Sequence, residues 1–174
     1  MSVVVVLPVK RFHDAKARLA AHGLRPGERR ALATGMLTDV LESLRKAEYV
    51  DDTVVVTGDA GAEMLARGYG AQSIADDPAA DHSAAAQRGI DWAIAQGAFH
   101  ALLLAGDTPA LDPAEIDELL DGLPEGREVV IVPDRHGTGT NALLLTPPDV
   151  IRPSFGEGSR ERHEQLARAA GAAV

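Results

Sequence analysis

The sequence predicts an α/β fold in which helices flank a mostly parallel central sheet, as a single domain over residues 1–174. Short apolar runs rich in β-branched residues alternate with segments whose apolar residues recur at helical spacing, and this alternation is typical of strands joined by crossover helices. The 174 residues, of which 45% are hydrophobic, suffice for one sizeable core. We find no internal repeat and no low-complexity linker that would divide the chain.

The expected strands are apolar runs bounded by turn residues. Pro8 lies near the end of the first run and predicts that this strand breaks into a loop there. Residues 101–110, A-L-L-L-A-G-D-T-P-A, predict a central parallel strand, because a continuous apolar run is typical of a strand buried on both faces. The strands are expected at 3–9, 53–57, 71–74, 99–105 and 128–133, with a further apolar segment at 142–145.

The expected helices are recognised by apolar stripes and by capping residues. Ser83 and Ser159 are the expected N-caps of two helices, and residues 112–115, D-P-A-E, predict a capping box with proline at the first helical position. A short helix is expected at 61–69. The stripe of the longest expected helix, at 26–47, consists of Leu32, Met36, Leu37, Val40, Leu41 and Leu44. The helix after Ser83 is expected to bury Ala86, Ile90, Ala93 and Ile94.

Composition excludes several classes of function. The chain has no cysteine, so disulfides, zinc-thiolate sites and thiol nucleophiles are excluded. A net charge of −9 argues against general nucleic-acid binding. No apolar run is long enough to span a bilayer, and no basic region precedes the first run as in a secretion signal. We therefore expect a cytoplasmic protein with neither nucleic-acid nor membrane partners. The six histidines lack zinc-site spacing, and there is no G-x-S-x-G elbow.

A basic cluster follows the first expected strand. Lys10, Arg11, Lys16 and Arg18 lie within nine positions of an otherwise acidic chain. The cluster indicates a local site for a small anion, and the alternative is a solvated charged loop.

Asp107 directly follows the expected central strand and its Gly106. In open α/β sheets, ligands gather beyond the carboxyl ends of the strands. A carboxylate at that position can hold a divalent cation, and the cation can hold phosphates. The alternative is that Asp107 only caps a turn.

Two glycine-rich segments have the character of anion sites. Residues 137–141, G-T-G-T-N, cannot be a dinucleotide fingerprint, because Pro147 and Pro148 leave too little room for the helix that the fingerprint must open. They predict either a nest of backbone N–H groups or an ordinary hairpin-like connection. Residues 155–160, F-G-E-G-S-R, lead into a helix whose N-terminus suits phosphate or carboxylate, with a plain cap as the alternative.

Four motifs in sequence order resemble the guanylyltransferases of coenzyme F420 biosynthesis, which act on phosphoenolpyruvate or 2-phospho-L-lactate. They are P-V-K-x5-A-K-x-R-L at 8–19, G-D-x-P-x-L at 106–111, G-T-G-T-N-A-L at 137–143 and F-G-x-G-S-x-x-x-H at 155–163. Together they span nearly the whole chain. The resemblance implies a nucleotidyltransferase fold, similar to that of nucleotide-diphospho-sugar transferases.

The resemblance also implies an activity and a set of site residues. It implies GTP as donor, Mg²⁺ as cofactor, a small phosphorylated carboxylic acid as acceptor, and pyrophosphate as leaving product. Asp107 matches the catalytic metal-binding acid of the family. The positions that hold the acceptor match Thr140, Gly156 and Ser159, and those on the nucleotide side match Pro8, Lys10, Lys16, Arg18 and Ser83.

The sequence departs from the family pattern at three places. Thr108 stands where the family commonly has leucine, and His82-Ser83 stand where a leucine-asparagine pair usually contacts the nucleotide. Relatives continue beyond the position of Val174 into an acidic segment that adds metal carboxylates. Two alternatives therefore stay open: a related nucleotidyltransferase that uses 3-phosphoglycerate or a sugar phosphate, and a non-catalytic nucleotide-binding relative. The family's labile product implies transient handover to the next biosynthetic transferase.

Overall fold

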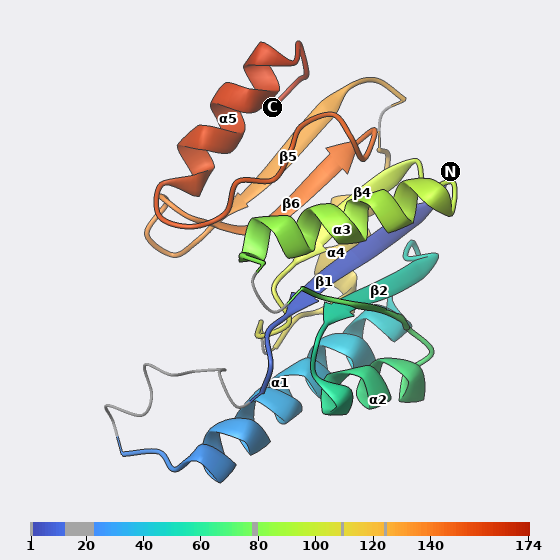
Figure 1. The fold of residues 1–174 in the computed structure, drawn as a ribbon. Helices are drawn as coiled ribbons and strands as arrows, with labels where there is room; N and C mark the ends of the chain where they lie inside the picture. The colour runs from blue at the N-terminus through green and yellow to red at the C-terminus, as the bar shows by residue number, and fades with distance from the viewer. Residues whose placement is uncertain (1, 13–22, 78–79, 109, 124) are drawn as a thin grey trace.

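A six-stranded sheet forms the centre of the part of the chain that the computed structural model describes, residues 2–12, 23–77, 80–108, 110–123 and 125–174 (Figure 1). The strand order is β3-β2-β1-β4-β6-β5. The strands are β1 (Val3–Val9), β2 (Asp52–Thr57), β3 (Gln72–Ala75), β4 (His100–Leu104), β5 (Glu128–Pro133) and β6 (Thr140–Thr146).

Helices cover both faces of the sheet, and each face has its own apolar core. One core lies beneath α1, α2 and α4, and the other lies beneath α3 and α5. The helices are α1 (Pro26–Lys46), α2 (Ala60–Gly68), α3 (His82–Ala95), α4 (Pro113–Leu120) and α5 (Ser159–Ala169). No helix in the described ranges combines the length and the apolar character needed to cross a membrane.

The sheet is mostly parallel, as predicted, and becomes antiparallel at one edge. The strands β3, β2, β1 and β4 pair in parallel, whereas β6 pairs antiparallel to both β4 and β5. The short connection between β5 and β6 accounts for this reversal, because a short loop can join only antiparallel neighbours. The strand β4 lies between β1 and β6, which confirms its predicted central place.

The register of β6 brings distant segments to the same edge of the sheet. Ala142 pairs with Leu104, the last residue of β4. Because the two strands run in opposite directions, Thr140 lies beside the turn that begins at Gly106. The start of β6 and the carboxyl end of β4 are therefore neighbours.

The first strand has the predicted bounds, since β1 ends at Val9, and two expectations about burial were wrong. Pro8 is part of the strand and pairs with Val56 of β2. Proline lacks the N–H that would donate to a neighbouring strand. Because the pairing of β1 with β4 ends at Val6, the missing N–H of Pro8 costs no hydrogen bond on the β4 side. Leu32 and Ile94 are exposed by 39% and 43% rather than buried. Leu32 lies in the N-terminal turns of α1, which extend away from the sheet (Figure 1).

Gly89 sets how closely α3 approaches the sheet. A Cβ atom at this position would lie 2.2 Å from Cγ1 of Val6 and 3.1 Å from Cγ2 of Val56. We expect Gly89→Ala to lower the free energy of unfolding by about 1–3 kcal/mol, because the helix must move off the strands. Urea titration measures this loss.

Gly35 in α1 is the matched control for that substitution, since no described atom lies within 4 Å of its added Cβ. We expect Gly35→Ala to stabilise the protein by about 0.5–1 kcal/mol through helix propensity alone. Equal stability of Gly89→Ala and the wild type would show that α3 packs less closely than described.

Candidate active site

The candidate site lies where the chain changes direction across the sheet. From β1 the chain passes to β2 and β3 on one side, and β4 then pairs with β1 on the other side. The crevice outside such a switch point is the usual ligand site of open α/β sheets. Lys10 follows β1 there and Asp107 follows β4. The predicted residues Lys16 and Arg18 lie outside the described residues.

The imidazole of His82 marks how close these two segments are. His82 is the first residue of α3 and is half-buried. Burial lowers its pKa most, the charge of Lys10 lowers the pKa further, and Asp107 raises it, as do Asp81 and Asp76. A lysine from the β1 side and an aspartate from the β4 side therefore both act electrostatically on the same ring.

Ser83 is not the N-cap of α3. The carboxylate of Asp81 caps the helix by accepting from the N–H of Ala84 at 2.8 Å, since the helix begins two residues earlier than predicted. The Ser83 hydroxyl instead accepts a hydrogen bond of 2.9 Å from the N–H of Phe155. Ser83, predicted on the nucleotide side, thus connects α3 to the glycine-rich segment before α5.

A cavity of about 280 Å³ opens beside the basic segment, at the carboxyl ends of the first three strands. Among the described residues, Oδ1 of Asp76 is buried from solvent and has no hydrogen-bond partner. Burial raises the pKa of Asp76. Asp76 is not among the residues predicted for the site, although its place in the polar loop after β3 was a signal. The cavity is lined by Val9, Lys10, Arg11, Gly58, Asp76, Asp77 and Ala80.

The chemistry of Asp107 fits a divalent cation that is shared with phosphates. Its side chain is exposed at the end of β4. Within the described ranges, no three His, Asp or Glu side chains converge into a complete protein cage for a metal ion. Mg²⁺ needs no such cage, because it is typically held by one or two carboxylates together with substrate phosphates and water.

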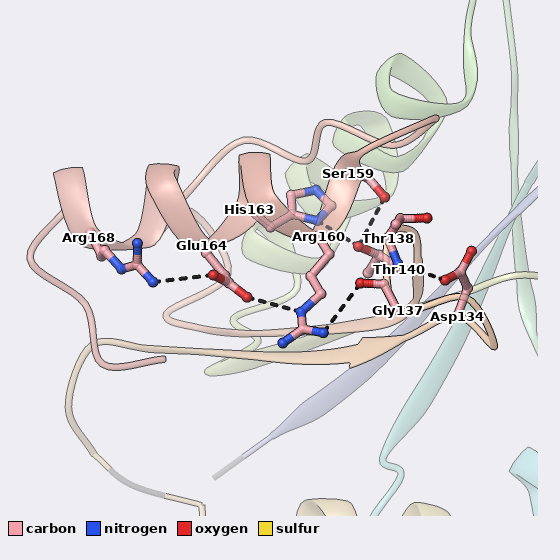
Figure 2. A network of polar contacts seen from close by, with 9 residues as sticks. All are labelled: Asp134, Gly137, Thr138, Thr140, Ser159, Arg160, His163, Glu164 and Arg168. Atoms are coloured by element: carbon pink, nitrogen blue, oxygen red, sulfur yellow. Dashed lines mark hydrogen bonds and ion pairs between the residues drawn. The ribbon is translucent and has the colours of Figure 1, made fainter.

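The loop between β5 and β6 is a hairpin connection that forms a backbone nest, and the nest holds an anion of the chain itself. Oδ1 of Asp134 accepts from the N–H of Thr138 at 3.0 Å (Figure 2). The N–H of His136 donates to the same oxygen at 3.1 Å. Hydrogen bonds from the backbone, that of Gly139 first, lower the pKa of Asp134. The predicted nest exists, but an external anion would have to displace this carboxylate.

The start of α5 also differs from the prediction. The N-cap is Gly158, with a φ of 68° that glycine adopts without strain, and Ser159 is the first helical residue. The N–H of Ser159 donates to the carbonyl of Gly156 at 3.1 Å, and that of Arg160 donates to the carbonyl of Thr138 at 3.1 Å. These two N–H groups, expected to serve an anion, connect α5 to its own loop and to the hairpin.

Thr140 and Ser159, both predicted on the acceptor side, are in direct contact (Figure 2). The Ser159 hydroxyl is 1% exposed and donates to Oγ1 of Thr140 at 3.1 Å. Nδ1 of His163, which is 0% exposed, lies 3.0 Å from the same oxygen. The third predicted residue, Gly156, lies in the turn before α5 with a φ of 112°.

Two arginines of α5 fix the loops on either side of this contact. Arg160 donates to the carbonyl of Gly137 in the hairpin and pairs with Glu164, which also pairs with Arg168 (Figure 2). Arg162 donates to the carbonyls of Ser154, Phe155 and Glu157. The predicted acceptor residues are therefore held by one helix that anchors both loops.

The buried His163 predicts an acid-sensitive stability. Burial, with the charge of Arg162 second, lowers its pKa from 6.5 to about 4. Between these values the unfolded chain binds a proton that the folded chain does not, so stability falls as pH drops from 6.5 to about 4. The loss amounts to about 3 kcal/mol at 1.36 kcal/mol per pKa unit.

Urea titrations of the wild type and His163→Asn at about pH 7 and about pH 4.5 measure this contribution. His82 and His100, whose pKa values burial also lowers, contribute equally in both proteins. We expect the variant to lose less stability on acidification. The same loss in both proteins would mean that His163 accepts a proton in the folded state.

The chain matches the protein family described as guanylyl transferase CofC like over residues 3–174. It is 52% identical to the phosphoenolpyruvate guanylyltransferase of Conexibacter woesei, in an alignment that covers 100% of this chain and 78% of the relative. It is 40% identical to the enzyme of the same name from Sphaerobacter thermophilus, over 98% of this chain and 81% of the relative.

The fold is shared with a solved nucleotidyl transferase from Methanothermobacter thermautotroptrophicus. The TM-score is 0.65 at 22% sequence identity, and the match covers 97% of this chain and 84% of that structure. This likeness confirms the nucleotidyltransferase fold that the four sequence motifs implied. The match along residues 3–174, together with these relatives, shows that the chain is a transferase enzyme of the CofC-like guanylyl transferase family.

Proposed function

We propose that the protein transfers GMP from GTP to the phosphate of phosphoenolpyruvate and releases pyrophosphate, as a step of coenzyme F420 biosynthesis. The observation that carries this proposal is the convergence of three groups at one edge of the sheet. Lys10 follows β1, Asp107 follows β4, and the hydroxyl network of Thr140 begins β6 beside that turn. A cation, an acid and an array of hydroxyls suit a nucleoside triphosphate, its metal ion and a small anionic acceptor.

The cavity beside β1 to β3 suits the guanine base and the start of the phosphate chain. Guanine carries two adjacent donors, N1–H and the N2 amino group, and a carboxylate accepts two parallel hydrogen bonds. The partnerless Oδ1 of Asp76 would regain a hydrogen bond from that edge. Lys10 and Arg11, on the same cavity wall, supply positive charge for the phosphates.

Asp107 would hold Mg²⁺ together with the phosphates of GTP. When bound, the ion supplies charge neutralisation for the triphosphate and for the leaving pyrophosphate. The single carboxylate at this place fits an ion that takes most of its ligands from substrate and water.

The acceptor would bind against Thr140 and Gly156, and the buried Ser159 would act through its hydrogen bond to Thr140. A phosphate oxygen of the acceptor attacks the α-phosphorus of GTP, the bond from that phosphorus to the bridging oxygen of the β-phosphate breaks, and pyrophosphate leaves. The attacking phosphate is already ionised at neutral pH, so no general base is required. The protein contributes orientation and electrostatic stabilisation.

The decisive experiment measures pyrophosphate release from GTP and Mg²⁺ with each of four acceptors: phosphoenolpyruvate, 2-phospho-L-lactate, 3-phosphoglycerate and a sugar phosphate. We expect release with phosphoenolpyruvate and a much lower rate with ATP in place of GTP. Pyrophosphate release only with another acceptor would overturn the assignment of phosphoenolpyruvate as substrate. No release with any of the four acceptors would overturn the proposed guanylyl transfer. In the cell we expect the reaction in the cytoplasm, with direct handover of the labile product to the next transferase.

A further inference from the structure

The two ring nitrogens of His163 face the two segments that build the acceptor side of the site. Nδ1 lies 3.0 Å from Oγ1 of Thr140, the first residue of β6. Nε2 accepts a hydrogen bond of 2.9 Å from the N–H of Ser154, in the segment before α5. The side chain is completely buried. His163 is the last residue of the F-G-x-G-S-x-x-x-H motif, and the resemblance implies no role for it.

These contacts fix which nitrogen carries the proton. A backbone N–H can only donate, so Nε2 must present its lone pair to Ser154. In a neutral imidazole the other nitrogen then carries the hydrogen. Nδ1 therefore donates to Oγ1 of Thr140.

Ser159 supplies a second hydrogen bond to the same oxygen. Its hydroxyl is buried and donates to Oγ1 of Thr140 at 3.1 Å. A buried hydroxyl proton without an acceptor would cost free energy, which sets the direction of this bond. Both lone pairs of Oγ1 therefore accept hydrogen bonds. The Thr140 hydroxyl can then only donate its own proton to a further partner.

We propose that His163 is a positioning residue for the acceptor: as the Nδ1–H tautomer it turns the Thr140 hydroxyl into a donor toward an anionic oxygen and holds residues 154–158 against β6. The inference rests on the proposed function for the identity of that anion. Thr140 is half-buried whereas Ser159 and His163 are not accessible, so Thr140 is the member of the network that can reach a ligand.

Two further observations agree with a neutral, fixed ring. Burial and the neighbouring Arg162 hold the pKa of His163 at about 4, so the ring carries no charge at neutral pH. The rings of Phe155 and His163 pack edge-on with centroids 5.3 Å apart, and the rings of Phe155 and His82 also pack edge-on at 5.0 Å. The three rings connect the acceptor side to the nucleotide side.

Two substitutions separate the two hydrogen bonds. His163→Asn places an amide donor near the position of Nδ1, whereas His163→Gln extends to the position of Nε2 and supplies an acceptor for Ser154 instead. We expect the KM for phosphoenolpyruvate to rise about tenfold or more in His163→Gln and about threefold or less in His163→Asn, with the KM for GTP within about twofold in both. The same change at the exposed His136, His136→Gln, is the matched control and should leave both constants unchanged.

Thr140→Val tests whether His163 acts through Thr140. In that background His163→Gln should add no further rise in the KM for phosphoenolpyruvate, because the hydroxyl through which it acts is gone. Additive effects of the two substitutions would overturn the proposal. Equal KM values in His163→Asn and His163→Gln, or a parallel rise in the KM for GTP, would also overturn it.

A measurement on the wild type does not depend on turnover or on the folding of any variant. Nitrogen-15 NMR of the histidine side chains distinguishes the tautomers, and we expect a proton on Nδ1 of His163 and none on Nε2. The opposite tautomer, or a charged ring at neutral pH, would overturn the proposal.

Calorimetry of phosphoenolpyruvate binding separates the positioning role of His163 from the proposed guanylyl transfer. Binding that weakens in His163→Gln without any pyrophosphate release would refute the proposed function and support the positioning role. Absence of phosphoenolpyruvate binding to the wild type would refute both.

Discussion

Replacing Asp107 by asparagine is expected to lower kcat/KM for GMP transfer by about a thousandfold or more. A bound metal ion contributes several kcal/mol to the stabilisation of a phosphoryl transition state, and about 4 kcal/mol corresponds to a thousandfold in rate. Asparagine keeps the size of the side chain but removes the charge that holds the cation. Steady-state kinetics at saturating GTP and varied Mg²⁺ measure the effect, and thermal unfolding checks that the fold is kept.

Asp81→Asn is the matched control for Asp107→Asn. Asp81 carries the same charge at the same edge of the sheet and also acts on His82. Its known task is to cap α3 through the N–H of Ala84, which asparagine performs equally well. We expect kcat/KM within about fivefold of the wild type. An Asp107→Asn enzyme that is no slower than this control would remove Asp107 from the metal site.

Asp76→Asn is expected to lower kcat/KM for GTP by about a hundredfold while leaving the low rate with ATP nearly unchanged. Hydrogen bonds to charged groups contribute about 1.5–3 kcal/mol each, and asparagine retains one acceptor of the two. Its amide nitrogen would also face the donor edge of guanine. Competition between GTP and ATP for one limiting acceptor gives the ratio directly.

Asp77 lines the same cavity next to Asp76, so Asp77→Asn removes the same charge from the same wall. We expect the control to change the preference for GTP over ATP by less than about threefold. If both substitutions reduce the preference for GTP over ATP equally, this preference depends on the total negative charge of the cavity, and Asp76 does not contact the base.

The residues predicted for the nucleotide side have local sequence signals. The carboxyl ends of parallel strands meet at one edge of the sheet, so Lys10 after β1 and Asp107 after β4 lie at the same edge, and both act on His82. Asp76 escaped the prediction because its distinguishing property, a buried oxygen without a partner, depends on how the loop after β3 packs.

For the predicted acceptor side, the sequence indicates a set of residues but not the contacts between them. The hydrogen bond from Ser159 to Thr140 spans 19 positions of sequence and depends on the antiparallel register of β6 with β4. His163 lies four residues after Ser159, and this spacing places both on one face of α5, which is the signal that could have identified it. The predicted N-caps at Ser83 and Ser159 were wrong because Asp81 and Gly158 satisfy the helix starts better.

By itself, the sequence determined the alternation of strands and helices, the central strand before Asp107 and the motifs that indicated the family. These properties follow from apolar periodicity, turn residues and short-range spacing, all of which act within a few residues of the chain. Only the tertiary structure decided which polar groups satisfy one another: Asp134 lies within its own hairpin nest, His163 lies between Thr140 and Ser154, and Oδ1 of Asp76 has no hydrogen bond to a described residue at the cavity. The physical reason is that hydrogen bonds are directional and short, so their pairing depends on strand register and helix docking across the whole sheet.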